Sequence, residues 1–138
     1  MNIDSIRNGI VIDHIEAGKG MEIYNLLDLD SLDCSVAIIK NAASTKMGKK
    51  DIIKIDAVID LNMDILGFVS PDATVDIIRD GVLVEKKKMT LPKKLVNVIS
   101  CKNPRCISTT EQELPNIFNL TNEEGRVYRC IYCESQGN

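Results

Sequence analysis

Four of the five cysteines in this chain of 138 residues lie after residue 100, and they form two pairs. Cys101 and Cys106 are separated by four residues, Cys130 and Cys133 by two, and 23 residues lie between the pairs. Two short loops with this spacing can present four thiolates to one Zn²⁺ ion, which prefers a tetrahedron of ligands. Because thiolates would fill all four positions, the sequence predicts a structural zinc and leaves no site for water or substrate.

Disulfides and thiol redox chemistry compete with zinc as uses of these cysteines. Disulfides are rare in a reducing cytosol, and the acidic first 30 residues lack the basic start and apolar centre of an export signal. A redox site at Cys130 and Cys133 is disfavoured because this pair follows an expected strand and does not open a helix. We therefore expect a cytoplasmic zinc protein.

The segment from residue 101 onward has too few apolar side chains to fold alone. Nine are available as a core: Ile107, Leu114, Ile117, Phe118, Leu120, Val127, Tyr128, Ile131 and Tyr132. Modules of fewer than about 40 residues usually need a metal, a disulfide or a partner. Zinc is therefore expected to supply folding free energy here.

Net charge argues against nucleic acid as the partner. The chain has 17 Lys and Arg against 20 Asp and Glu, and a zinc bound by four thiolates adds further negative charge. Docking to another protein fits the tail better, although its polar residues could also merely cover the metal. A free-standing zinc-ribbon adaptor that binds RNA or DNA through the lysines of 46–54 and 86–94 is the alternative from another functional class. No membrane partner is expected, because the longest apolar run, 65–69, is far shorter than the roughly 20 residues that span a bilayer.

The first 90 residues alternate between strand and helix patterns. Strands are expected at 9–15, 34–41, 49–58, 73–78 and 82–86, helices at 21–30 and 60–69, a loop at 42–48 and a tight turn at Asp80-Gly81. Alternation within 9–15 puts Ile10, Ile12 and His14 on one face. This order predicts an α+β fold, a ferredoxin-like split βαβ sheet with two helices on one face.

A lysine-rich stretch around Pro92 marks a boundary between two parts. We expect a first domain at 1–90, a hinge at 91–100 and a small all-β, zinc-ribbon-like domain at 101–138.

Several polar side chains interrupt the expected strands of the first domain. Lys50 and Lys54 share one face of a strand, because side chains repeat every two residues. Asp13 and His14 lie in the first strand and Lys86 lies near the end of the last. Collected together, these groups offer cations for phosphates and a carboxylate for ribose hydroxyls, which describes a nucleotide pocket. The ordinary alternative is solvated lysines and a structural histidine.

Known catalytic and phosphate-binding motifs are absent from the sequence. It contains neither GxxxxGK[ST] nor a GxGxxG after a strand. The single histidine, His14, has no nucleophile marked beside it, and Cys34 is best interpreted as a small buried hydrophobic residue. No nucleophile with a nearby base therefore stands out in the sequence.

Taken in order and spacing, several segments resemble the regulatory chain of aspartate carbamoyltransferase. They are VIDHI at 11–15, MGKKDIIKI at 47–55, ATVDII at 73–78, Leu91-Pro92, Asn97 and the two cysteine pairs. The resemblance implies a noncatalytic subunit of pyrimidine biosynthesis with an N-terminal nucleotide-binding domain and a C-terminal zinc domain. It also implies that two such chains pair and bridge trimers of catalytic chains, with CTP and often UTP as inhibitors and ATP opposing them.

The same resemblance implies contacts with the nucleotide. The residues concerned are Ile6, Asp13, His14, Lys50, Lys54, Asp76, Ile78, Gly81 and Lys86. Asp13 would bind ribose hydroxyls, Lys54 the base and ribose, and His14 and Lys86 the phosphates. Ile6 and Gly81 would offer main-chain contacts to the base, Lys50 would meet a second nucleotide or its metal ion, and residues 3–6 would close over the pocket. Asp76 replaces a common Asn near the phosphates, so its charge should weaken binding unless Mg²⁺ bridges it.

In the zinc domain the resemblance, together with exposed sequence between the ligands, implies contacts with the catalytic chain. The residues are Asn103, Arg105, Tyr132 and Glu134. Arg105 stands where the family has a small amide, which predicts an altered interface.

Overall fold

The structure is a computed structural model that describes residues 6–111 and 113–137. The chain divides into two compact units, Met1–Thr90 and Leu91–Asn138. No helix within the described residues is long and apolar enough to cross a membrane. Residues 3–5, expected to close over the nucleotide pocket, lie outside the described residues.

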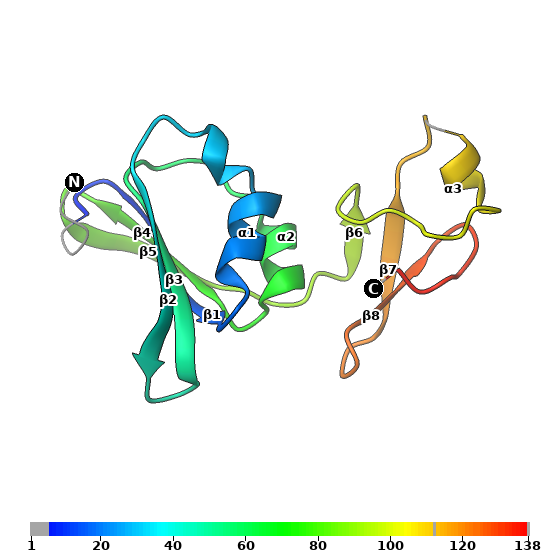
Figure 1. The fold of residues 1–138 in the computed structure, drawn as a ribbon. Helices are drawn as coiled ribbons and strands as arrows, with labels where there is room; N and C mark the ends of the chain where they lie inside the picture. The colour runs from blue at the N-terminus through cyan, green and yellow to red at the C-terminus, as the bar shows by residue number, and fades with distance from the viewer. Residues whose placement is uncertain (1–5, 112, 138) are drawn as a thin grey trace. The chain divides into compact units, whose positions relative to one another are not determined.

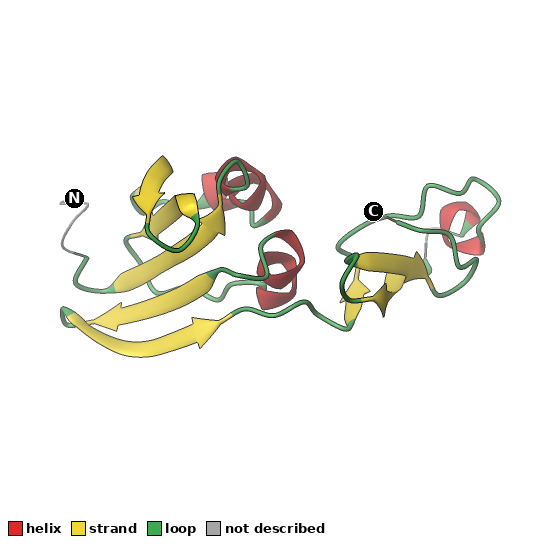
Figure 2. Ribbon diagram, turned by 90° about the horizontal axis from the view of Figure 1, so that it is seen from below, coloured by secondary structure: helices red, strands yellow, loops and turns green. Residues whose placement is uncertain are grey.

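The first unit is a five-stranded antiparallel sheet with helices on one face (Figures 1 and 2). Its elements are β1 (Gly9–Glu16), α1 (Gly20–Leu26), the 3-10 turn η1 (Leu29–Ser31), β2 (Val36–Ser44), β3 (Gly48–Ile55), α2 (Met63–Val69), β4 (Thr74–Arg79) and β5 (Val82–Lys88). The strands lie in the order β2-β3-β1-β4-β5. The α+β class and the split βαβ order are confirmed.

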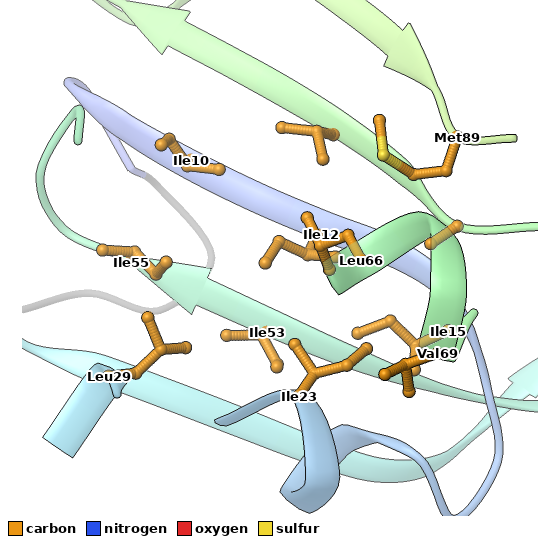
Figure 3. Packing of buried hydrophobic residues seen from close by; sticks show 12 residues of the cluster. Ile10, Ile12, Ile15, Ile23, Leu29, Ile53, Ile55, Leu66, Val69 and Met89 are labelled. Carbon is orange, nitrogen blue, oxygen red and sulfur yellow. The ribbon is translucent and has the colours of Figure 1, made fainter. Parts of the chain in front are cut away.

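Isoleucines dominate the core between the sheet and its helices (Figure 3). Ile12 of β1 and Ile53 of β3 are completely buried, and Ile23 of α1 and Leu66 of α2 pack on them from the helical layer. Each such side chain contributes about 1.5–3 kcal/mol by leaving water. The helical layer covers one face only, so the polar residues that alternate with these isoleucines lie on the opposite face.

A β-bulge in β1 changes the expected alternation. Where β1 pairs with β3, the register shifts between Ile12 and Ile15, so Asp13 and His14 lie opposite a single residue. His14 has a φ of 56°, which side chains other than glycine rarely adopt. Because of the extra residue Ile15 returns to the buried face, and the expectation that His14 shares the face of Ile12 is wrong.

Both helices are shorter than the periodicity predicts. The first ends at Leu26, because Asp28 takes a left-handed conformation with a φ of 54° and a 3-10 turn follows. The second begins at Met63, where the side chain of Asn62 accepts hydrogen bonds from the N–H groups of Asp64 and Ile65.

The expected loop at 42–48 is also mostly strand. Pairing with β3 continues through Ala42 and Ala43 to Ser44, after a second register shift that follows Ile39. Only residues 45–47 form the turn, because the ladder of backbone hydrogen bonds outweighs the weak strand preference of these small residues.

The second unit is a small three-stranded sheet with one short helix. Its elements are β6 (Lys94–Val96), α3 (Ile107–Thr110), β7 (Ile117–Asn122) and β8 (Val127–Cys130), in sheet order β6-β7-β8. Leu95, Phe118 and Tyr128 are completely buried in it. The segment 91–100, expected as a hinge, contributes β6 to this sheet. Leu95 is buried between two exposed neighbours and lies opposite Phe118 of β7.

Candidate functional site

The sulfur atoms of Cys101, Cys106, Cys130 and Cys133 lie within 4.8 Å of one another in the second unit. Cys101 Sγ and Cys133 Sγ are 3.5 Å apart, and Cys106 Sγ and Cys130 Sγ are 3.6 Å apart. Zn–S bonds of about 2.3 Å in a tetrahedron place sulfurs about 3.8 Å apart, so the four ligands fit one zinc. A disulfide needs about 2.0 Å, and all five cysteines are free.

Backbone hydrogen bonds shape the two loops that present these ligands. In the first, Cys106 N–H donates to the Asn103 carbonyl at 3.1 Å and Arg105 N–H donates to Asn103 Oδ1 at 3.0 Å. In the second, Glu134 N–H donates to the Cys130 carbonyl at 2.9 Å, and Glu134 adopts a φ of 63°. The thiols are thus held together by local turns that short Cys spacings favour.

The thiols differ in how readily they lose a proton. Burial raises the pKa of Cys101 to about 12. A hydrogen bond with the Ser108 hydroxyl, whose oxygen is 3.0 Å from Cys106 Sγ, lowers the pKa of Cys106, and hydrogen bonds with Ser135 lower the pKa of Cys133 to about 6. Zinc binds thiolates, so its binding releases the remaining protons and its affinity falls as pH falls.

The residues expected to touch a catalytic chain surround this centre. Arg105 and Glu134 are exposed, whereas Asn103 is half-buried and Tyr132 donates its hydroxyl to the Pro115 carbonyl at 3.1 Å. A hollow of about 490 Å³ lies beside the second cysteine loop, lined by Asn119, Thr121, Arg129, Cys130, Ile131 and Glu134. Asn103 and Tyr132 therefore shape the unit, while Arg105 and Glu134 stand open to a partner.

A row of polar residues crosses the uncovered face of the first unit's sheet. Lys54 of β3 pairs with Val11 of β1, Val11 with Asp76 of β4, and Asp76 with Lys86 of β5. Residues directly opposite each other in neighbouring strands point to the same side. We call this surface the polar sheet face and define it by Asp13, His14, Lys50, Lys54, Thr74, Asp76 and Lys86.

Asp13 lies at the centre of the contacts on the polar sheet face. Lys50 Nζ is 2.9 Å from Asp13 Oδ1, and the backbone N–H of His14 donates to the same oxygen at 2.6 Å. Burial would raise the pKa of Asp13, but the hydrogen bonds from Lys50 and His14 outweigh it and hold the pKa below its usual value. Asp13 therefore stays ionised and keeps its lone pairs as acceptors at neutral pH.

Two residues on this side of the sheet escaped the sequence analysis. Thr74 is nearly buried, and its hydroxyl lies 3.1 Å from Nδ1 of His14, where it orients the ring. Lys88 pairs with Thr74 across β4 and β5, which places a further ammonium on this side of the sheet. Strand alternation alone could have found both, because Thr74 and Lys88 lie two residues from Asp76 and Lys86.

The Oδ1 atom of Asp76 is buried and has no hydrogen-bond partner among the described residues. Ile78 lies two residues further along β4 and hence on the same side, half-buried. A buried carboxylate oxygen without a donor costs free energy, and a ligand that supplies a donor or a cation would recover it.

The β4–β5 turn and residues 7–8 lie together at one end of this face. Gly81 N–H donates to the Arg7 carbonyl at 2.9 Å, and Asp80 N–H donates to Asn8 Oδ1 at 3.1 Å. Ile6 is buried, with 7% of its surface exposed. The N–H of Gly81 is thus engaged within the chain, which limits the main-chain contacts that it can offer to a base.

Comparison with known proteins covers both units. The family described as "Aspartate carbamoyltransferase regulatory chain, allosteric domain" matches residues 1–90, and "Aspartate carbamoyltransferase regulatory chain, metal binding domain" matches residues 93–138. A regulatory chain of Clostridium botulinum is 51% identical over 134 residues, which are 97% of this chain and 92% of the relative. One from Bifidobacterium longum is 46% identical over 136 residues, 99% and 98% of the two chains, and one from Clostridium tetani is 47% identical over 135 residues, 97% and 94%.

The closed thiolate site and the open sheet define a noncatalytic zinc protein with an allosteric unit and a metal-binding unit. The chain belongs to the family of aspartate carbamoyltransferase regulatory chains. Its zinc is structural, and its membership implies a catalytic chain as partner.

Proposed function

We propose that the polar sheet face binds nucleoside triphosphates, with CTP, ATP and UTP competing for one pocket. The row that aligns Lys54, Asp76 and Lys86 across the four strands from β3 to β5 carries this proposal. Lys54 serves the base and ribose, Lys86 and His14 the phosphates, and ionised Asp13 the ribose hydroxyls. Lys50 contacts Asp13 directly, and the family resemblance assigns it to a second nucleotide or its metal ion.

Replacing Lys54 by alanine is expected to weaken binding of CTP and ATP about five- to tenfold, because a half-buried ammonium contributes about 1 kcal/mol to such a contact. Isothermal titration calorimetry at fixed salt measures the effect. Lys46→Ala removes the same charge from the exposed β2–β3 turn and serves as the control. Equal affinities for wild type and Lys54→Ala would refute the assignment of this face.

The zinc unit docks the catalytic chain and so holds catalytic trimers together in the cytoplasm. Arg105 and Glu134 are exposed beside the metal centre, and Glu134 also lines the hollow described above. The hollow is lined by a charged residue of each sign, Arg129 and Glu134, which suits a polar protein interface. The zinc itself takes no part in chemistry, since its four positions are filled by sulfur.

We propose further that two regulatory chains pair through β5. This strand lies at the edge of the sheet, and its residues Val82, Leu83 and Val84 are 61%, 52% and 53% exposed. An edge strand with exposed apolar residues is a template for pairing with another chain. A second copy supplies an identical edge and closes the pair by twofold symmetry.

Nucleotide binding reaches the catalytic chain through a short connection between the units. Met89 is buried in the first unit and donates its N–H to the Ala73 carbonyl at 2.9 Å. In the second unit the Tyr128 hydroxyl donates to the Pro92 carbonyl at 2.6 Å. We therefore infer that the hinge consists of Thr90 and Leu91 and is shorter than the expected segment 91–100. Pro92 restricts Leu91 to extended conformations.

Tyr128→Phe is expected to reduce inhibition by CTP at least twofold while zinc content and CTP affinity stay unchanged. Loss of the hydroxyl frees the Pro92 carbonyl and lengthens the flexible connection, and allosteric coupling of about 1–3 kcal/mol is sensitive to such a change. Activity of the complex with catalytic chains, measured with and without CTP, gives the coupling. Thr110→Ala, which loses a side-chain bond to the Ile107 carbonyl in the same unit, is the control. Unchanged inhibition in Tyr128→Phe would rule out this route.

A further inference from the structure

Asp51 of β3 is a completely buried carboxylate that accepts three backbone hydrogen bonds. Its Oδ2 accepts from the N–H groups of Gly18 at 3.1 Å and Gly20 at 3.0 Å, and its Oδ1 accepts from Asn41 N–H at 3.0 Å. Burying a charge is costly unless hydrogen bonds replace its water. These three donors come from the β1–α1 connection, the first residue of α1 and strand β2, so one side chain ties all three segments to β3.

Two of the three register shifts in this sheet adjoin Asp51, and the third lies between β4 and β5. On one side of β3 the register with β1 shifts just before the pair Ile15 and Asp51. On the other side the register with β2 shifts between Ile39 and Ala42, and the extra residue Asn41 has a φ of 58°. The N–H that Asn41 turns away from the ladder is the one that Asp51 accepts. A single carboxylate therefore satisfies the donor that the β2 bulge leaves over.

Gly20 gives an independent sign that this carboxylate has a fixed place. A Cβ atom added at Gly20 would lie 2.9 Å from Asp51 Oδ2 and 3.1 Å from Asp51 Cβ. Both distances are shorter than ordinary van der Waals contacts, so the first residue of α1 must lack a side chain for the carboxylate to reach the N–H groups there. Glycine at position 20 thus leaves room for the Asp51 carboxylate.

The polar sheet face lies on the side of β3 opposite to the Asp51 carboxylate. Lys50 precedes Asp51 on β3 and points to the opposite side, where its ammonium contacts Asp13. Asp13 and His14 are the two residues of the β1 bulge. A change of one residue in register would move all three side chains to the wrong face.

We propose that Asp51 is the positioning residue for the polar sheet face, because it fixes the chain on both sides of β3 and with it the places of Asp13, His14 and Lys50. Asp51 touches no nucleotide itself. Its effect on nucleotide affinity rests on the nucleotide binding proposed above. Its effect on the places of Asp13, His14 and Lys50 does not depend on that binding.

Asp51→Asn tests the proposal with little change of size. An asparagine keeps one acceptor oxygen but turns an NH₂ group toward the remaining N–H, so either the β1–α1 connection or Asn41 loses its partner. His14 is the single histidine of the chain, and its ring signals in NMR spectra report the bulge directly. We expect these signals to shift and the dissociation constant for CTP to rise about tenfold or more. The zinc content should stay at one ion per chain.

A second variant and a control separate positioning from general destabilisation. Gly20→Ala displaces the same carboxylate without removing it, so it should shift the His14 signals in the same way. If Asp51→Asn does not fold, Gly20→Ala provides the test. Asn62→Ala removes an acceptor of two backbone N–H groups at the start of α2, so it should destabilise the unit without moving His14.

The results distinguish the two proposals. If His14 signals and CTP affinity stay at their wild-type values in both Asp51→Asn and Gly20→Ala, the positioning role is refuted. If the wild-type chain binds no nucleotide, the proposed function fails, and the shift of the His14 signals still decides whether Asp51 fixes the bulge.

Discussion

Removal of zinc by a chelator is expected to unfold residues 91–138 while the sheet of the first unit persists. Among its described residues the second unit buries three large side chains completely, Leu95, Phe118 and Tyr128. A structural zinc contributes on the order of 10 kcal/mol to folding such modules. Backbone NMR spectra of the full chain, recorded before and after chelation, follow both units at once. We expect the signals of the second unit to collapse to random-coil positions and to return when zinc is added.

Two cysteine variants make the same prediction specific to the metal ligands. Cys130→Ser removes one ligand and should abolish stoichiometric zinc binding together with the fold of the second unit. Cys34→Ser alters a half-buried cysteine just before β2 and should leave zinc content at one ion per chain. A zinc-free chain that keeps the dispersed signals of its second unit would contradict the structural role of the ion.

Replacement of Asp76 by asparagine is expected to tighten binding of nucleoside triphosphates about ten- to 100-fold in the absence of Mg²⁺. Asp76 lies between the strands that carry Lys54 and Lys86, so its negative charge would oppose the phosphates of a nucleotide bound as proposed, at a cost of about 1–3 kcal/mol. Its buried Oδ1 atom has no donor to offset that charge among the described residues. Calorimetric titration with CTP and with ATP measures the gain.

Magnesium and a matched variant serve as controls for this effect. A divalent cation between the Asp76 carboxylate and the phosphates would strengthen nucleotide binding to the wild type. Saturating Mg²⁺ should therefore reduce the difference in affinity between the wild type and Asp76→Asn. Asp60→Asn removes the same charge from an exposed residue that precedes α2 and should change affinity less than twofold. Equal affinities of wild type and Asp76→Asn without Mg²⁺ would show that phosphates do not lie near Asp76.

Local chemistry explains which features could be predicted from the sequence. Cysteine spacing predicts a zinc site because four thiolates in two short loops have few other stable arrangements in a reducing environment. The order of strands and helices follows from hydrophobic periodicity, and it is confirmed for all seven major elements of the first unit.

The bulges could not be predicted, because they depend on contacts between distant segments. The positive φ angles of His14 and Asn41 occur where β1 and β2 pair with β3. Residue type marks them only weakly, because His and Asn merely tolerate this conformation better than most residues do. Asp51 itself carried a signal that was overlooked. It shares its face with Ile53 and Ile55 by strand alternation, and a carboxylate on an otherwise apolar face indicates buried hydrogen-bond donors.

Assembly with catalytic chains tests the central claim that the zinc-bound unit is what couples this chain to its enzyme. Analytical ultracentrifugation of purified catalytic trimers mixed with native, chelated and zinc-restored chain measures it directly. We predict a large complex with the native and restored chain and separate components with the chelated one. A complex of the same size formed by chain shown to contain no zinc would contradict the account.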